Sequence, residues 1–140
     1  MAATASADWK GGLQTGSGTF SAGERIAGEV SFRSRFEDAP GANPEQLIAA
    51  AHASCFSMAL SAALEQAGTP VESVSTEASV TLRMVDGVPT ITAIALRTVG
   101  VVPGINQAAF AEAAQEAKAG CPVSRALAGV PEITVEATLA

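Results

Sequence analysis

Alternating apolar and polar positions dominate the first part of the chain. Residues 8–37 contain several glycines and place apolar side chains at alternating positions, which predicts a β-hairpin or a small meander. The expected buried side carries Phe20, Ile26, Val30 and Phe32. A turn at residues 38–41 (DAPG) then ends this β segment.

A long helix is predicted after the turn. Asn43 is a suitable N-cap, Pro44 suits the first helical position, and Gln46 stands where a capping box needs it. The helix should extend to about residue 67, because Gly68 is a typical C-terminal stop.

The second half of the pattern predicts two strands, a helix and a closing strand, at residues 74–82, 91–101, 105–118 and 133–139. Asp86 and Gly87 form the turn of an antiparallel hairpin, and Gly120 ends the second helix. The order β-β-α-β-β-α-β predicts an α+β fold with sheets packed on two helices. The chain shows no repeat and no linker, so residues 1–140 are expected to form a single domain.

Composition narrows the functional classes. Hydrophobic residues make up 48% of the chain, which excludes disorder. The formal net charge of -6 argues against a nucleic-acid partner. The N-terminal segment lacks the apolar core of a secretory signal, and no apolar run approaches the roughly 20 residues of a membrane span. We therefore expect a cytoplasmic protein without a membrane partner.

The centre of the first helix, AAAHASCFSMALSAA, is small or apolar around most of its circumference. A helix with this pattern is buried on more than one face. The sheets of one 140-residue chain are expected to cover it only in part, and its many alanines allow close helix approach. This pattern favours a homodimer whose core includes the helix.

Sulfur chemistry is the leading candidate activity. The chain has two cysteines, Cys55 within the apolar helix and Cys121 after the second helix. In a reducing cytoplasm such a pair of cysteines is more often catalytic, redox-sensing or inert than a permanent structural disulfide. Two cysteines and one histidine without metal-ligand spacing do not predict a zinc site, and no cofactor is expected.

Burial should raise the pKa of Cys55, so a reactive thiolate needs a cation nearby. His52 lies three residues earlier on roughly the same helix face and is either a neighbour of the sulfur or a hydrogen-bonded core histidine. Arg33 and Arg35 are better cation candidates because a guanidinium stays charged when desolvated. The alternative is that both arginines are solvated charges on an edge strand.

Cys121 follows Gly120 and precedes Pro122, an N-cap-like position before a short helical turn. Helix N-termini lower the pKa of a thiol, which would suit a leaving or resolving group. The alternative is a small buried apolar residue at a helix junction.

The runs NPEQLIAAAHASCFSMAL and GCPVSRAL resemble the OsmC branch of the OsmC/Ohr family, with RFEDAPGANPEQL and VPGI extending the likeness over nearly the whole chain. These are bacterial thiol-dependent peroxidases of organic hydroperoxides. The resemblance implies an intertwined α+β homodimer in which two antiparallel sheets wrap around central helices. It also implies active sites at the subunit interface.

The resemblance further implies that Cys55 is the peroxidatic cysteine, Cys121 the resolving cysteine, Arg35 the activating cation and Glu45 the carboxylate that orients it. Arg33 remains an alternative to Arg35. Ten residues separate Glu45 from Cys55, or about 15 Å along one straight helix. Glu45 would therefore come from the partner subunit, or the helix must bend.

The implied substrates are an organic hydroperoxide and an external dithiol reductant of the dihydrolipoamide type. Phe56 and Met58 would favour organic over hydrogen peroxide. Two other classes stay open: a redox sensor, and a non-catalytic module that binds a small apolar ligand.

Overall fold

The computed structural model describes all residues, 1–140, and divides them into two compact units, Met1–Leu47 and Ile48–Ala140. The first unit is a small antiparallel sheet with a short helix. Its strands pair in the order β1-β2-β3. Its elements are β1 (Ala5–Lys10), β2 (Ser17–Ala22), β3 (Ile26–Val30) and α1 (Phe32–Phe36).

Helix α1 differs from the expectation, because residues 32–36 lie within the segment predicted as β structure. Ser31 begins the helix with a capping box, in which its hydroxyl accepts from the backbone N–H of Ser34 and the Ser34 hydroxyl accepts from the N–H of Ser31. Arg33 and Arg35 therefore lie on a helical turn, and the edge-strand interpretation of these arginines is wrong. Ile26, expected on the buried side, is instead 54% exposed.

Helix α2 (Pro44–Gln66) begins and ends as predicted. The backbone N–H of Gln46 donates to the Asn43 side chain and the N–H of Asn43 donates to the Gln46 side chain, at 2.9 and 3.1 Å. Gly68 follows the helix with a φ of 84°, the left-handed conformation typical of a C-terminal stop.

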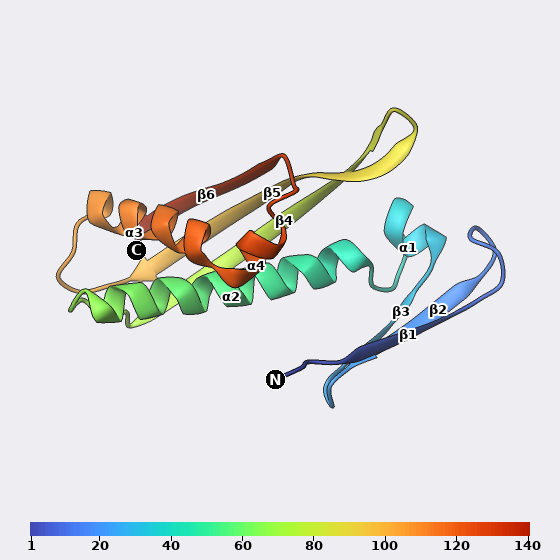
Figure 1. Ribbon diagram of the computed structural model, residues 1–140, viewed down its shortest axis with the longest axis horizontal. Coiled ribbons are helices and arrows are strands. Elements are labelled where there is room, and N and C mark those ends of the chain that lie inside the picture. The colour runs from blue at the N-terminus through green and yellow to red at the C-terminus, as the bar shows by residue number, and fades with distance from the viewer. The chain divides into compact units, whose positions relative to one another are not determined.

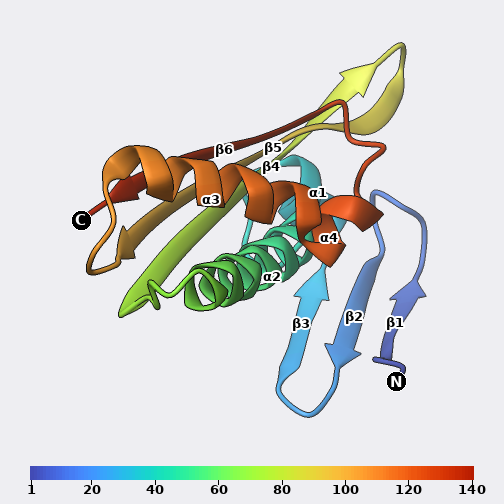
Figure 2. The ribbon, with the colours of Figure 1, turned by 60° about the vertical axis from the view of Figure 1, so that its left-hand side comes forward.

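The second unit contains a mixed sheet that is covered by helices (Figure 1). In Figure 2, α2 and α3 lie side by side against one face of this sheet. Besides α2, its elements are β4 (Ser73–Val85), β5 (Val88–Val101), α3 (Gln107–Gly120), α4 (Pro122–Ala126) and β6 (Glu132–Leu139).

The strand directions differ from the expectation of two antiparallel sheets. The β4–β5 hairpin is antiparallel and turns at Asp86 and Gly87, as predicted. Strand β6 instead pairs parallel to β5, for instance Ile94 beside Ile133. A parallel neighbour requires a long crossover connection, and α3 and α4 supply it. The α+β class is confirmed, and the second sheet is mixed.

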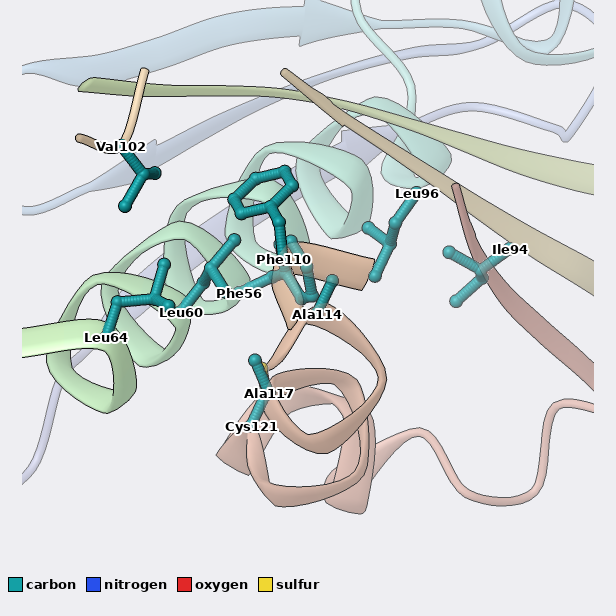
Figure 3. Packing of buried hydrophobic residues seen from close by; sticks show 10 residues of the cluster. All are labelled: Phe56, Leu60, Leu64, Ile94, Leu96, Val102, Phe110, Ala114, Ala117 and Cys121. Carbon is teal, nitrogen blue, oxygen red and sulfur yellow. The ribbon is translucent and has the colours of Figure 1, made fainter. Parts of the chain in front are cut away.

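One stripe of α2 enters the core of the second unit. His52, Phe56, Leu60 and Leu64 recur every four residues and are at most 4% exposed. Figure 3 shows Phe56 and Leu60 next to Phe110 of α3, with Leu96 of β5 nearby.

The length of α2 corrects one expectation. This 23-residue helix is long and apolar enough to cross a membrane by length and composition. The chain has no uninterrupted apolar run of this length, but the average hydropathy of α2 stays high despite isolated polar residues such as His52 and Ser54. A core helix can have the same length and composition; α2 buries one stripe in the second unit, and 22% of its apolar window is buried in the single chain.

A close approach between β5 and α3 generates a stability prediction. A Cβ added at Gly100 would lie 2.5 Å from Cζ of the fully buried Phe110 ring. We expect Gly100→Ala to lower the free energy of unfolding by about 1–3 kcal/mol, measured by urea denaturation. Gly129→Ala is the control, because nothing lies within 4 Å of a Cβ there. Equal stabilities of the two variants would contradict the packing argument.

Candidate active site

Cys55 lies on α2 at the border of the buried stripe, between His52 and Phe56. Its side chain packs against the core and is half-buried, so the sulfur has a core side and an open side in the single chain.

Cys121 is fully buried between α3 and α4. Its backbone N–H donates to the carbonyl of Ala117 at 2.8 Å and closes α3, while Pro122 opens α4. The N-cap-like position predicted from the sequence is confirmed, although the sulfur makes no capping hydrogen bond.

The two thiols lie close enough to influence each other. Burial raises the pKa of Cys55, the neighbouring Cys121 raises it further, and the backbone N–H of Val123 opposes the rise. Burial also acts to raise the pKa of Cys121, but the nearby Ser124 backbone N–H, Cys55 thiol, Ser124 hydroxyl and Val123 backbone N–H lower it overall. No cationic side chain contributes to either shift.

Arg35 and Glu45 form an ion pair in the first unit. Arg35 donates to Oε1 of Glu45 from Nη2 at 2.8 Å and from Nε at 3.2 Å. The Glu45 carboxylate stands in the first turn of α2 and is only 8% exposed. Two N–H groups of one guanidinium on one carboxylate fix the direction in which the rest of the guanidinium points.

Arg33 has a different partner. Its Nε donates to Glu37 at 3.0 Å, four residues further along the chain, and both side chains are more than half exposed. An exposed pair of this kind contributes little energy, so Arg33 is the more weakly held of the two arginines.

The walls beside Arg35 are mostly apolar. A pocket of about 210 Å³ in the first unit is lined by the Arg35 side chain together with apolar residues, chiefly Trp9, Leu13, Phe32 and Phe36. The guanidinium carbon of Arg35 lies 5.4 Å from the centroid of the Phe36 ring. A cation at the edge of an apolar pocket can bind a polar group at one end of an otherwise apolar molecule.

His52 is the hydrogen-bonded core histidine of the two alternatives. Its ring is fully buried, and Nε2 lies 2.6 Å from the hydroxyl oxygen of Ser124. Burial lowers the pKa of His52 and keeps the ring neutral. Sequence reasoning missed Ser124, which lies three residues after Cys121. The sequence signal that could have indicated Ser124 is its spacing from Cys121, which is that between a helix N-cap and the third helical residue.

The four predicted site residues thus form two pairs, Cys55 with Cys121 and Arg35 with Glu45, one in each compact unit. The structure holds no group of three or more His, Cys, Asp or Glu side chains suited to a metal ion.

Comparison with known proteins gives the family. A model of the OsmC-like protein family matches residues 36–136. The chain is 46% identical over 132 residues to the Escherichia coli (strain K12) protein named Peroxiredoxin OsmC, covering 93% of this chain and 91% of that protein, and equally similar to its Shigella flexneri counterpart.

Solved structures of proteins named OsmC and Ohr have a similar fold. The Bacillus subtilis organic hydroperoxide resistance protein OhrB is 25% identical, with a TM-score of 0.73 over 98% of both chains. A Legionella pneumophila organic hydroperoxide resistance protein OsmC is 24% identical, with a TM-score of 0.73 over 98% of this chain and 96% of that one.

The chain belongs to the OsmC family. It is a cysteine-based, thiol-dependent peroxidase, and therefore an oxidoreductase.

The buried histidine predicts a pH dependence of stability. His52 is the single histidine of the chain, and its pKa lies below 6.5 when folded but returns to the ordinary value when unfolded. The unfolded chain then binds more protons, so the free energy of unfolding falls as pH drops below about 6.5, by up to ~1.4 kcal/mol per unit. Urea denaturation at about pH 7.5 and about pH 5.5 measures this loss. We expect His52→Gln to lose less stability over that range, and an unchanged pH dependence would contradict the assignment.

Proposed function

We propose that this peroxidase reduces organic hydroperoxides to alcohols through a disulfide between Cys55 and Cys121, with Arg35 as the activating cation held by Glu45. The observation that carries the proposal is that Cys55 and Cys121, which lie far apart in the sequence, pack in the same core cluster and shift each other's pKa. The names of the relatives, peroxiredoxin and organic hydroperoxide resistance protein, support the reaction and the substrate class.

The cycle has three steps. The Cys55 thiolate attacks the distal peroxide oxygen, so that an S–O bond forms, the O–O bond breaks and the alkoxide leaves as an alcohol after taking a proton. Cys121 then attacks the sulfur of the Cys55 sulfenic acid, which gives the disulfide and releases water. An external dithiol reduces the disulfide and is itself oxidised; the family resemblance points to a dihydrolipoamide-type compound.

The first step needs a cation. Burial raises the pKa of Cys55, and the second unit offers that thiol no positive charge. Arg35 would favour the thiolate and stabilise the charge that develops on the peroxide oxygens. The apolar pocket beside Arg35 would accept the organic part of the hydroperoxide, which supports an organic substrate over hydrogen peroxide.

We propose that Arg35 and Glu45 act on Cys55 of a second subunit in a homodimer. Helix α2 is one element from Pro44 to Gln66, and its rise separates Glu45 from Cys55 by about 15 Å. Outside the buried stripe much of α2 is exposed in the single chain, including Met58 at 73%. Burial of α2 on more than one face would therefore require a partner. A homodimer would supply it and join the two halves of the site.

The remaining proposals concern setting and partners. We infer that the 140 residues act as a single OsmC-like domain, because α2 continues across the border of the two compact units and the family model spans it. The protein is proposed to act in the cytoplasm without a cofactor, a metal, a nucleic acid or a membrane. A redox-sensor role would use the same disulfide with little turnover, and no observation favours it over catalysis.

Intact mass tests the cysteine roles. One equivalent of cumene hydroperoxide should remove two hydrogens from the reduced protein, and Cys55→Ser should abolish this change and turnover. Cys121→Ser should still consume one equivalent but stop at a sulfenic or higher acid on Cys55. A Cys121→Ser variant that still turns over fully would contradict the resolving role of Cys121.

Mutation of the arginines tests the cation. We expect Arg35→Ala to slow the oxidation of Cys55 by about 100-fold, because one charge-stabilising donor is lost from the transition state. Arg33→Ala is the matched control on the same helical turn and should change the rate by less than about twofold.

Mixed dimers test which subunit supplies the arginine. In a dimer of one Cys55→Ser chain and one Arg35→Ala chain, activity returns only if Arg35 reaches the Cys55 of its partner. If the mixed dimers form and stay inactive, the arginine acts within its own chain.

A further inference from the structure

The second unit contains a buried polar pair that the proposed cycle does not use. His52 of α2 and Ser124 of α4 lie 72 residues apart in the sequence, and their side chains meet at 2.6 Å. Their residues are 0% and 7% exposed. Buried polar groups cost stability unless they are hydrogen-bonded, so the direction of this bond determines what the pair can do.

The second ring nitrogen of His52 settles that direction. Nδ1 is buried and has no hydrogen-bond partner. A buried N–H without an acceptor is rarer than a buried lone pair without a donor, so Nδ1 carries the lone pair. The hydrogen of the neutral ring is then on Nε2, which donates to the Ser124 oxygen.

The hydroxyl hydrogen of Ser124 is therefore free for another acceptor. Ser124 stands at the third helical position after Cys121, and its hydroxyl is one of the neighbouring donors that lower the pKa of the Cys121 thiol. With His52 Nε2 as the donor, the Ser124 hydroxyl is left able to donate toward the Cys121 sulfur, three residues earlier in the chain.

We propose that His52 and Ser124 are positioning residues for the resolving cysteine: His52 orients the Ser124 hydroxyl so that it donates to Cys121 and favours the thiolate that attacks oxidised Cys55. The inference rests on the proposed resolving role of Cys121. In that step the Cys121–Cys55 S–S bond forms and the S–O bond of the sulfenic acid breaks. The proton of the Cys121 thiol and the departing hydroxide leave together as water.

The same donor also serves the reduction of the disulfide. Cys55 is half-buried and Cys121 is fully buried, so an external dithiol meets the Cys55 sulfur first. Cys121 is then the leaving group, and a thiol whose thiolate is stabilised leaves faster. The His52–Ser124 pair would therefore support both the formation and the opening of the disulfide.

Kinetics of the two oxidation steps test the proposal. Reduced protein is mixed with cumene hydroperoxide, and quenched samples are analysed for Cys55 sulfenic acid, trapped with dimedone, and for disulfide. We expect Ser124→Ala to slow disulfide formation about tenfold, the loss of one hydrogen bond to a charged group, with Cys55 oxidation changed by less than about twofold. Ser124→Thr keeps the hydroxyl and should restore the rate.

A matched control comes from α2, the helix that carries His52. Ser57 donates its hydroxyl to Thr76 at 2.8 Å, so Ser57→Ala removes a similar bond away from Cys121 and should change neither step. Disulfide formation at the wild-type rate in Ser124→Ala, or equal slowing of both steps, would overturn the proposal. A wild-type protein that never forms the disulfide would instead refute the resolving role, and this inference with it.

Two further measurements remain decisive if Ser124→Ala folds poorly. His52→Gln keeps an N–H near the Nε2 position and should form the disulfide faster than His52→Leu; equal slowing would overturn the orienting role. In a Cys55→Ser background the single thiolate absorbs near 240 nm. There Ser124→Ala should raise the pKa of Cys121 by about one unit, and no shift would exclude the donor.

Discussion

The packing of one stripe of α2 against its sheet and α3 determines where Cys55 lies relative to the core. Buried residues every four positions fix the rotation of the helix about its axis, since successive residues turn by about 100°. Cys55 precedes the buried Phe56 by one position and so lies at the border between core and surface. A sulfur at that border can touch a buried partner on one side and remain reachable from the other, which a deeper or more exposed position would prevent.

Charge is distributed unevenly between the two compact units. The thiols lie among apolar groups and neutral donors, while Arg35, the proposed activating cation, is held by a nearly buried carboxylate in the other unit. Neither pair leaves an uncompensated buried charge, because the guanidinium is paired with Glu45 and the thiols can stay protonated. In the proposed homodimer this separation would make reactivity depend on assembly, and an isolated chain would keep its cysteine weakly nucleophilic.

The sequence predicted the parts of the fold that depend on local signals. Asn43, Gln46 and Gly68 marked the ends of α2, and Asp86 with Gly87 marked the hairpin turn. Helix α1 escaped prediction because five residues are too few to show a helical period. Its cap also uses a serine where glutamate or glutamine is usual.

Strand direction and the His52–Ser124 contact depend on tertiary packing, which local patterns do not encode. Two kinds of sequence information predicted the candidate site. Burial of Cys55 indicated that its thiolate needs a cation nearby, whereas the roles of Arg35 and Glu45 followed from the family resemblance. The pairing of Arg35 with a carboxylate ten residues away could not be read from spacing, because a turn intervenes between the two helices.

The parallel pairing of β5 and β6 places Cys121 in the middle of a crossover connection, remote in the sequence from Cys55. A covalent link between these sulfurs would close a loop of roughly half the chain, and in a chain-entropy account such a loop stabilises the fold by roughly 4 kcal/mol. The same bond would then serve both catalysis and the stability of the fold. Each turnover would alternately raise and lower the stability of the second unit, so thermal unfolding of a sample would report the fraction of molecules in the disulfide form.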